Sequence, residues 1–374
     1  MNSKKITFSS KVQLFLILFS TVFIIISWLS TSFSDWYTDN IFPIWINTYG
    51  RFTSLFPFSV GEIMIFAGVL WLAILLVFLL ILLVMFFSCL FKKNTNFFHT
   101  PNVIKKYLKA TSWILTIVYL IMNLNCFVLY HCTQIPSNQS YTLEDLTLLR
   151  DHIVTILNES STNFDRDDSG NIIYSGDMQE EAMLSLQNLS GSYPRAKGYQ
   201  VTPKILASSV FMSQQYMQGY YFPFSMEANI NGLMSIGNKP FTMCHELAHT
   251  RGYIYEDEAN LIGFFACINS DDAFFKYSGY LSVLNYVNNA FYKSVDLETY
   301  KSHIKVSDLV WYDDEFLTSD AWNYVNSHSL FSTETVKEAA DTFVDTSLKV
   351  NGVKEGKLSY DHVVDLLITY YDYN

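Results

Sequence analysis

Five consecutive residues of the 374-residue chain, H-E-L-A-H at positions 245–249, combine two histidines and a carboxylate at helical spacing. Histidines four positions apart on a helix project from one face, so both imidazoles can bind a single zinc ion. The glutamate between them can take a proton from water at that ion. We therefore predict a zinc site with His245 and His249 as ligands and Glu246 as the catalytic general base.

A zinc ion in a hydrolytic site needs a third protein ligand and an open position for water. The run to Gly252 matches the start of the metzincin pattern, but Tyr255 stands where that pattern has its third histidine. In the gluzincin pattern a glutamate from the next helix completes the site instead. The sequence E-D-E-A-N at positions 256–260 begins such a helix and offers two candidates, Glu256 and Glu258.

The two glutamates lie about 200° apart on a helical wheel, so both cannot face one ion. Glu258 shares its side with Ile262 and Phe265, which suit a core. Small residues share the face of Glu256 and would allow close packing against the H-E-L-A-H helix: Ala259, Asn260, Gly263 and Cys267. We favour Glu256 as the third ligand, with Glu258 as the alternative. In gluzincins the position of Asn260 supports a zinc histidine, and this spacing resembles theirs.

The elements that would position these residues are a helix and a strand. Pro240 suits the first turn of a helix and Gly252 its end, which predicts a helix over 240–251. Residues 220–231 alternate aromatic and apolar side chains as an extended segment does. Pro223 within them favours an edge strand of a small sheet, of the kind that pairs with substrate in zincins, and the alternative is an ordinary hairpin in such a sheet.

Three apolar stretches precede this region, at residues 12–29, 60–90 and 111–132, and each is long enough to cross a bilayer. The first begins after lysines, as a signal peptide does, but no small-residue cleavage site follows it. We predict that it is a retained span. The anchor would then comprise residues 1–133.

The basic residues around the spans predict their orientation. Arg51 alone lies between the first two spans, whereas lysines precede the first span and fill the loop between the second and third: Lys4, Lys5, Lys11, Lys92, Lys93, Lys105, Lys106 and Lys109. The positive-inside rule then places residues 134–374 outside the cell membrane. The net charge of -11 argues against a nucleic-acid partner.

The expected fold is membrane-anchored and mainly α: N-terminal transmembrane helices followed by an α+β zincin-like metallopeptidase domain with a small sheet. Residues 42–58 read as a short membrane-facing loop, or alternatively as a segment in the outer interface. Residues 165–171 resemble the front of a calcium loop, but Gly176 stands where its closing glutamate would be, which favours a plain turn.

Other residues are weaker candidates for chemistry. Tyr or His donors could stabilise a developing oxyanion; the candidates are Tyr360, His362, His303, His328 and Tyr312. Cys244 and Cys267 fall on the two site helices and are expected as free thiols, with a disulfide as the alternative.

From Phe222 to Cys267 the chain resembles a bacterial family of membrane-anchored proteins classed as a domain of unknown function. The segments that carry the resemblance are 223–229, 240–242, 245–249, 251–252 and 256–260, and later 347–349, 359–360 and 363–367. At Ser225 and Met226 the family pattern would have threonine and glycine. The resemblance implies a zinc-peptidase-like ectodomain and names no substrate.

The function predicted from the sequence is a membrane-anchored zinc peptidase in which Glu246 activates water for attack on a peptide bond. Its partners would be a peptide or protein substrate and the lipid bilayer, and its oligomeric state is open. Two alternatives remain: a zinc-binding pseudoenzyme or ligand-binding module, and a zinc hydrolase acting on cell-wall material.

Overall fold

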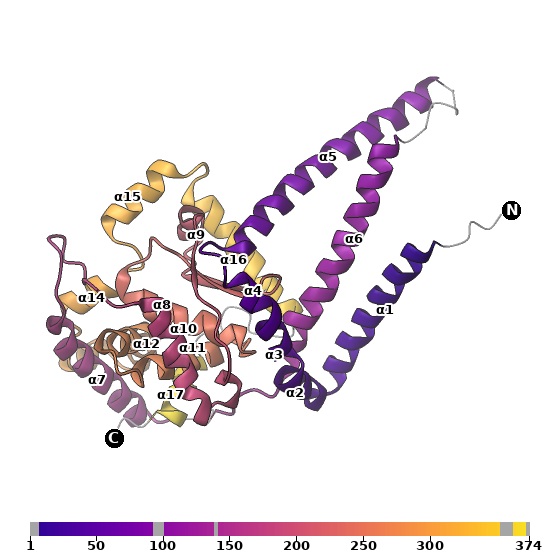
Figure 1. Ribbon diagram of the computed structural model, residues 1–374. Coiled ribbons are helices and arrows are strands. Elements are labelled where there is room, and N and C mark those ends of the chain that lie inside the picture. The colour runs from indigo at the N-terminus through magenta and orange to yellow at the C-terminus, as the bar shows by residue number, and fades with distance from the viewer. Residues whose placement is uncertain (1–6, 93–100, 138–140, 352–361, 372–374) are drawn as a thin grey trace.

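A computed structural model describes residues 7–92, 101–137, 141–351 and 362–371. These residues are mainly helical and contain a small sheet of three strands. Three long helices project together from a globular part that holds the rest of the described chain (Figure 1). The expectation of a mainly helical chain with apolar N-terminal helices and a small sheet is confirmed.

The three long helices are α1 (Phe8–Leu29), α5 (Val60–Lys92) and α6 (Asn102–Asn125). In the part of the chain that the structure describes, they are the helices long and apolar enough to cross a membrane, α6 together with the 3₁₀ turn that follows it. Their residues correspond to the three predicted spans, although α6 starts nine residues before the predicted 111–132 stretch. Each buries little of its apolar surface, as lipid-facing helices do.

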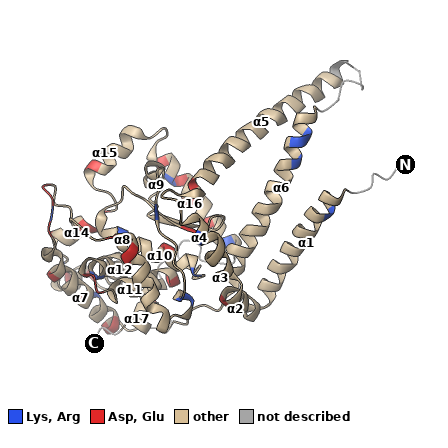
Figure 2. Ribbon diagram, in the orientation of Figure 1, with Lys and Arg blue, Asp and Glu red and all other residues tan. Residues whose placement is uncertain are grey.

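Polar side chains join the long helices to one another. Between α5 and α6, the Trp71 indole donates to Thr111 Oγ1 at 3.0 Å. Between α1 and α6, the Asn123 amide donates to Ser20 Oγ at 2.5 Å. Such interhelical hydrogen bonds are favoured where lipid offers no alternative partner. Figure 2 shows Lys and Arg on α1 and α6 near the ends that lie far from the globular part.

The segment between α1 and α5 is helical and packs in part onto the globular part, so the prediction of a plain loop is wrong. It forms α2 (Thr31–Asn40), α3 (Phe42–Trp45) and α4 (Arg51–Thr53). Phe42 and Ile46 are fully buried, in the same hydrophobic cluster as Leu247 of the H-E-L-A-H helix. An apolar pattern does not distinguish burial in lipid from burial against protein. The core therefore extends across the boundary predicted at residue 133. Large apolar side chains of the segment stay exposed at Ile44, Phe52, Leu55 and Phe58, and contact of this segment with a membrane stays a prediction.

The remaining helices surround the sheet. They are α7 (Leu143–Ser160), α8 (Met178–Asn188), α9 (Ser209–Gln214), α10 (Lys239–Thr250), α11 (Glu256–Ile268), α12 (Ala273–Ser294), α13 (Leu297–Ser302), α14 (Asp308–Asp314), α15 (Ser319–His328), α16 (Thr333–Val350) and α17 (Val363–Tyr370). The helices α10, α11 and α12 pack against one another at the centre of the core.

The sheet has the order β1-β3-β2, with β1 (Lys204–Ile205), β2 (Gly219–Phe222) and β3 (Glu227–Ile230). β1 runs parallel to β3, and β2 runs antiparallel to it. The segment predicted as one extended edge strand is instead a hairpin, the alternative interpretation: Pro223 lies in the turn, β2 is at the edge of this sheet, and β3 is its central strand. Both β2 and β3 pack on α10.

Two smaller predictions concern the turn and the thiols. Residues 165–171 form a turn in which Asp167 Oδ1 accepts from the backbone N–H of Ser169 and Asn171, as expected. Cys244 and Cys267 are buried free thiols that lie in contact, so the disulfide alternative is not what the structure contains.

Candidate metal site

The helix α10 carries the H-E-L-A-H residues in its C-terminal half. Pro240 occupies its first turn, and Gly252 follows its end with φ of +91°, a left-handed conformation that favours glycine. A Cβ at Gly252 would lie 2.6 Å from Thr38 Cγ2, so glycine is also needed to admit α2. The helix predicted over 240–251 is confirmed, and its sharp end returns the chain to start α11 at Glu256.

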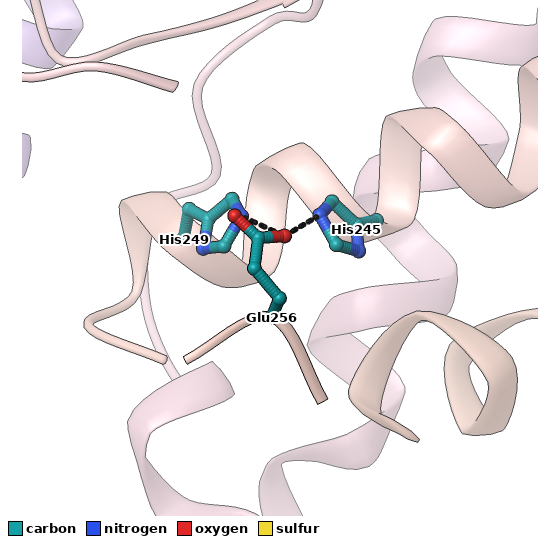
Figure 3. Close-up of side chains that lie close together, drawn as sticks. All are labelled: His245, His249 and Glu256. Carbon is teal, nitrogen blue, oxygen red and sulfur yellow. Dashed lines mark ion pairs between the residues drawn. The ribbon is translucent and has the colours of Figure 1, made fainter. Parts of the chain in front are cut away.

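The structure brings His245, His249 and Glu256 together (Figure 3). Glu256 Oε2 lies 3.2 Å from His245 Nε2 and 3.6 Å from His249 Nε2. The three candidate ligand atoms lie within 4.8 Å of one another. Two ligand atoms at zinc-bond length from a tetrahedral ion are about 3.4 Å apart, so this spacing matches what an ion would require.

Close packing of α11 on α10 makes this approach feasible. A Cβ added at Gly263 would lie 3.2 Å from the backbone nitrogen of His245 and 3.1 Å from the Phe241 ring. A larger residue at 263 would push the two helices apart. The face of α11 that carries small residues thus meets α10, as predicted from the helical wheel. Glu256, at the start of this face, reaches the two histidines.

Hydrogen bonding orients one imidazole for ligation. His249 donates from Nδ1 to the carbonyl oxygen of Tyr253 at 2.7 Å, which fixes the ring with Nε2 facing Glu256. Asn260 lies beside His245 and favours its protonated form. Among the described residues, however, neither His245 Nδ1 nor the Asn260 amide nitrogen has a well-formed hydrogen bond. Asn260 therefore lies beside one of the two histidines, but the hydrogen bond by which it was predicted to support a zinc histidine is not formed.

The triad is electrostatically coupled. Burial opposes ionisation of Glu256, but the charge of His249 and hydrogen bonds from both histidines hold its pKa well below the usual range. Burial likewise opposes protonation of His249, but Glu256 outweighs it and raises the pKa of His249 to about 9. Burial lowers the pKa of His245. A buried carboxylate that attracts two imidazoles also attracts a divalent cation.

Glu246 points to the strand side of α10. It is 4% exposed, and its Oε2 has no hydrogen-bond partner among the described residues. A Cβ at Gly219 on β2 would lie 2.7 Å from Glu246 Oε1, so only glycine leaves room for this carboxylate. Burial raises the pKa of Glu246 to about 8.

Glu258, the alternative third ligand, lies elsewhere. Its Oε1 accepts a hydrogen bond from the backbone N–H of Ile135 at 2.6 Å. It is not part of the cluster formed by the two histidines and Glu256. Its carboxylate instead joins α11 to the segment that follows α6.

A cleft of about 850 Å³ opens over the triad. Its walls come from β2, α10, α12, α16 and the end of α6, and its polar lining includes Tyr130, Gln218, Tyr220, Asn238, Glu246, Asn260, Asn285, Tyr286 and Asp314. Sequence reasoning missed most of these residues, because no motif surrounds them. Tyr220 and Tyr286 line the cleft and carry phenols, one of the two donor types predicted for an oxyanion.

The oxyanion candidates named from the sequence lie outside the cleft lining or outside the described residues. Tyr360 lies outside the described residues, and His362 is exposed just before α17. His303 contacts Asp151 at 2.9 Å, and His328 is exposed at the end of α15. Tyr312 donates to the Ser169 carbonyl at 2.8 Å. Each of these described residues makes a local contact or is exposed, and none lines the cleft.

Comparison with known protein families matches residues 37–368 to the family described as "Protein of unknown function (DUF3810)". The match runs from α2 to α17 and includes all three triad residues. No curated protein and no solved structure matches the chain.

Proposed function

Since the chain belongs to the DUF3810 family, whose description assigns no function, we propose one from its own site: a membrane-anchored zinc peptidase with a zincin-like ectodomain. The observation that carries the proposal is the convergence of His245, His249 and Glu256 beside the buried carboxylate of Glu246, in one cleft.

The donor set fits zinc. Two imidazole nitrogens and one carboxylate oxygen are its usual ligands in hydrolytic sites, and three protein ligands leave a fourth position open. His245, His249 and Glu256 would hold the ion. When bound, the ion would supply Lewis-acid polarisation of water and of the substrate carbonyl.

Glu246 would move the proton. Its buried carboxylate would accept a proton from the attacking water through Oε2 and later deliver it to the departing amine. A purely structural metal site has no use for a buried carboxylate held in this position, which favours hydrolysis over a structural role. The phenols of Tyr220 and Tyr286 line the cleft as candidate donors to the developing oxyanion.

The edge strand favours an extended substrate. β2 lines the cleft along its whole length, and its outer edge carries backbone donors and acceptors that β3 does not use. A peptide can add to such an edge as a further strand. Gly219 at the start of β2 adjoins Glu246, so a peptide bonded to β2 would pass the general base.

The distribution of basic residues supports an extracytoplasmic location for the globular part. The basic ends of α1 and α6 point away from the globular part (Figure 2), and such ends face the cytoplasm in membrane proteins. The globular part would then be extracytoplasmic, in a multi-pass protein of the cell membrane.

The test uses the full chain purified in detergent or reconstituted in lipid. Zinc content is measured by mass spectrometry, and cleavage is measured on an unbiased mixture of peptides. We expect about one zinc per chain, loss of zinc and activity in His249→Ala, and neither loss in the matched variant His328→Ala. Glu246→Gln should keep its zinc and lose activity by roughly 10²- to 10⁴-fold.

Two results would contradict the proposal. A wild-type chain that binds no zinc would remove the metal site. A zinc-loaded chain that cleaves no peptide would favour the ligand-binding module, or the cell-wall hydrolase if peptidoglycan fragments are cleaved instead.

A further inference from the structure

The candidate metal site is joined directly to the end of the third long helix. Tyr130 lies in the 3₁₀ turn that follows α6, and its carbonyl oxygen accepts a hydrogen bond from the Tyr255 phenol at 2.5 Å. The two rings meet edge to face with centroids 5.6 Å apart. Tyr255 immediately precedes the ligand Glu256, so the ligand is one residue from a contact with the end of the helix.

The turn between β2 and β3 is also tied to α6. The Asn125 amide donates to the Pro223 carbonyl at 3.0 Å, and the Tyr221 phenol donates to the Asn125 carbonyl at 3.2 Å. Asn125 is the last residue of α6. The hairpin that borders the cleft therefore turns beside the point where this helix ends.

The start of α5 meets the same hairpin. Glu227, the first residue of β3, is fully buried and accepts hydrogen bonds from the backbone N–H of Val60 at 3.0 Å and of Gly61 at 2.7 Å. A carboxylate in this position caps the helix and opposes its dipole. The hairpin thus contacts the ends of both α5 and α6 that join the globular part.

The lipid boundary lies close to these contacts. On α5 large apolar side chains are exposed from Ile63 onward, two residues after Gly61, whose N–H Glu227 accepts. On α6 the exposed apolar run ends at Tyr119 and gives way to the buried amides of Asn123 and Asn125. Trp28, at the end of α1, packs on His131 with ring centroids 4.4 Å apart, in the position of an interfacial aromatic.

The distance from this boundary to the site is short. The cleft that holds His245 is also lined by Met122 and Cys126. From Tyr119 to Cys126 the helical rise amounts to about 10 Å. From the turn to Gly219, which adjoins Glu246, the strand β2 likewise spans about 10 Å.

We propose that the site acts on polypeptides anchored in the same membrane and cleaves them close to the surface, about three to five residues beyond the lipid boundary. Three to five extended residues, at about 3.3–3.6 Å each, cover roughly 10–18 Å, which is the rise of about 10 Å from Tyr119 to Cys126 and most of the similar length of β2. The inference rests on the proposed function and on α1, α5 and α6 crossing a bilayer. A substrate confined to the membrane plane gains a high effective concentration at a cleft placed there.

The experiment uses the full chain reconstituted in lipid vesicles. Its substrate is one peptide sequence that the chain cleaves, presented free in solution or attached to a single transmembrane helix through spacers of about 3, 5, 10 and 20 residues. Glu246→Gln in the same vesicles shows which cleavage depends on the site. We expect the anchored substrates with the two shorter spacers to be cleaved at least ~10²-fold faster than the free peptide at equal bulk concentration.

Equal cleavage of free and anchored peptide, or a rate that rises up to the longest spacer, would overturn this inference and leave the peptidase proposal standing. Cleavage of no peptide in any format by a zinc-loaded chain would overturn the peptidase proposal and this inference with it. The two failures are therefore distinguishable.

Discussion

Glu258 accepts a hydrogen bond from the backbone N–H of Ile135 at 2.6 Å, although it stands only two residues after Glu256 on the same helix. Glu256 faces the two histidines, and Glu258 faces the segment that leaves the membrane helices. Helical geometry separates their directions by about 200°. One glutamate is therefore available to a metal ion, and the other holds the segment that follows α6 in place.

Because Glu256 and Glu258 face different parts of the molecule, substitutions of the two residues should give different results. Glu256→Gln should abolish stoichiometric zinc binding, because it removes the carboxylate from the triad. Glu258→Gln should keep its zinc, since its amide oxygen still accepts from Ile135 and burial already raises the pKa of Glu258 to about 7. Glu258→Ala should cost about 1–3 kcal/mol of stability, because it leaves the Ile135 N–H without its partner.

Zinc content and thermal unfolding of the purified full chain measure both effects. Loss of zinc in Glu258→Gln with retention in Glu256→Gln would reverse the ligand assignment.

Gly219→Ala should impair catalysis without removing the metal. The new Cβ would lie 2.7 Å from Glu246 Oε1 and 2.8 Å from the Asn229 carbonyl oxygen, so the carboxylate or the strand must shift. Small misplacements of a catalytic group cost on the order of 10²-fold in rate. We expect kcat to fall by about that factor with unchanged zinc content. Gly191→Ala is the matched control, because its Cβ would meet nothing within 4 Å; equal activity in both variants would contradict the placement of Glu246.

The cap that Glu227 provides to α5 should contribute to stability. Its carboxylate receives two backbone N–H groups of the helix start, and it is fully buried. Glu227→Ala should lower stability by roughly 0.5–2 kcal/mol or more, the range for a lost cap. Glu227→Gln, which keeps an acceptor but loses the charge, should have a smaller effect. Thermal unfolding in detergent measures the difference, and an unchanged melting temperature in Glu227→Ala would argue against a capping role.

Asp314 should make stability depend on pH. Burial raises the pKa of this carboxyl to about 7, although the Asn285 amide donates to it at 2.7 Å. The folded chain holds this proton more tightly than the unfolded chain, whose carboxyl titrates near 4. Its contribution is therefore fully present below about pH 4 and is lost as the pH rises towards 7.

The variant Asp314→Asn removes this titration. Between pH 5 and 8 the wild-type chain should lose more stability than the variant, by at most about 3 kcal/mol, because about two pH units separate pH 5 from the folded pKa. The comparison of the two melting temperatures at each pH isolates Asp314 from the other groups. A constant difference across this range would show that Asp314 has an ordinary pKa.

Local periodicity made several features predictable. The i, i+4 spacing places His245 and His249 on one side of α10 whatever the rest of the chain does. Apolar stretches of bilayer length must form helices, because lipid offers no partner for backbone groups. Pro240 and Gly252 bracket α10 through their own backbone preferences.

Other features depend on contacts between distant segments. Phe42 and Ile46 are buried in the protein core, but an apolar residue that packs in a core and one that faces lipid are indistinguishable in the sequence. The cleft combines Met122, Gly219, Tyr286 and Val344 from four separate elements, and no pattern links them.

The three long apolar helices, the H-E-L-A-H helix and the two glutamates that could complete a metal site were predictable from residue order, because each follows from the geometry of one helix. Which glutamate meets the histidines, and how near the site lies to the long apolar helices, became clear from the folded arrangement. Both depend on how α11 packs on α10 and how the hairpin docks on α5 and α6. Those arrangements are set by the summed packing of residues far apart in the chain, which local periodicity does not encode.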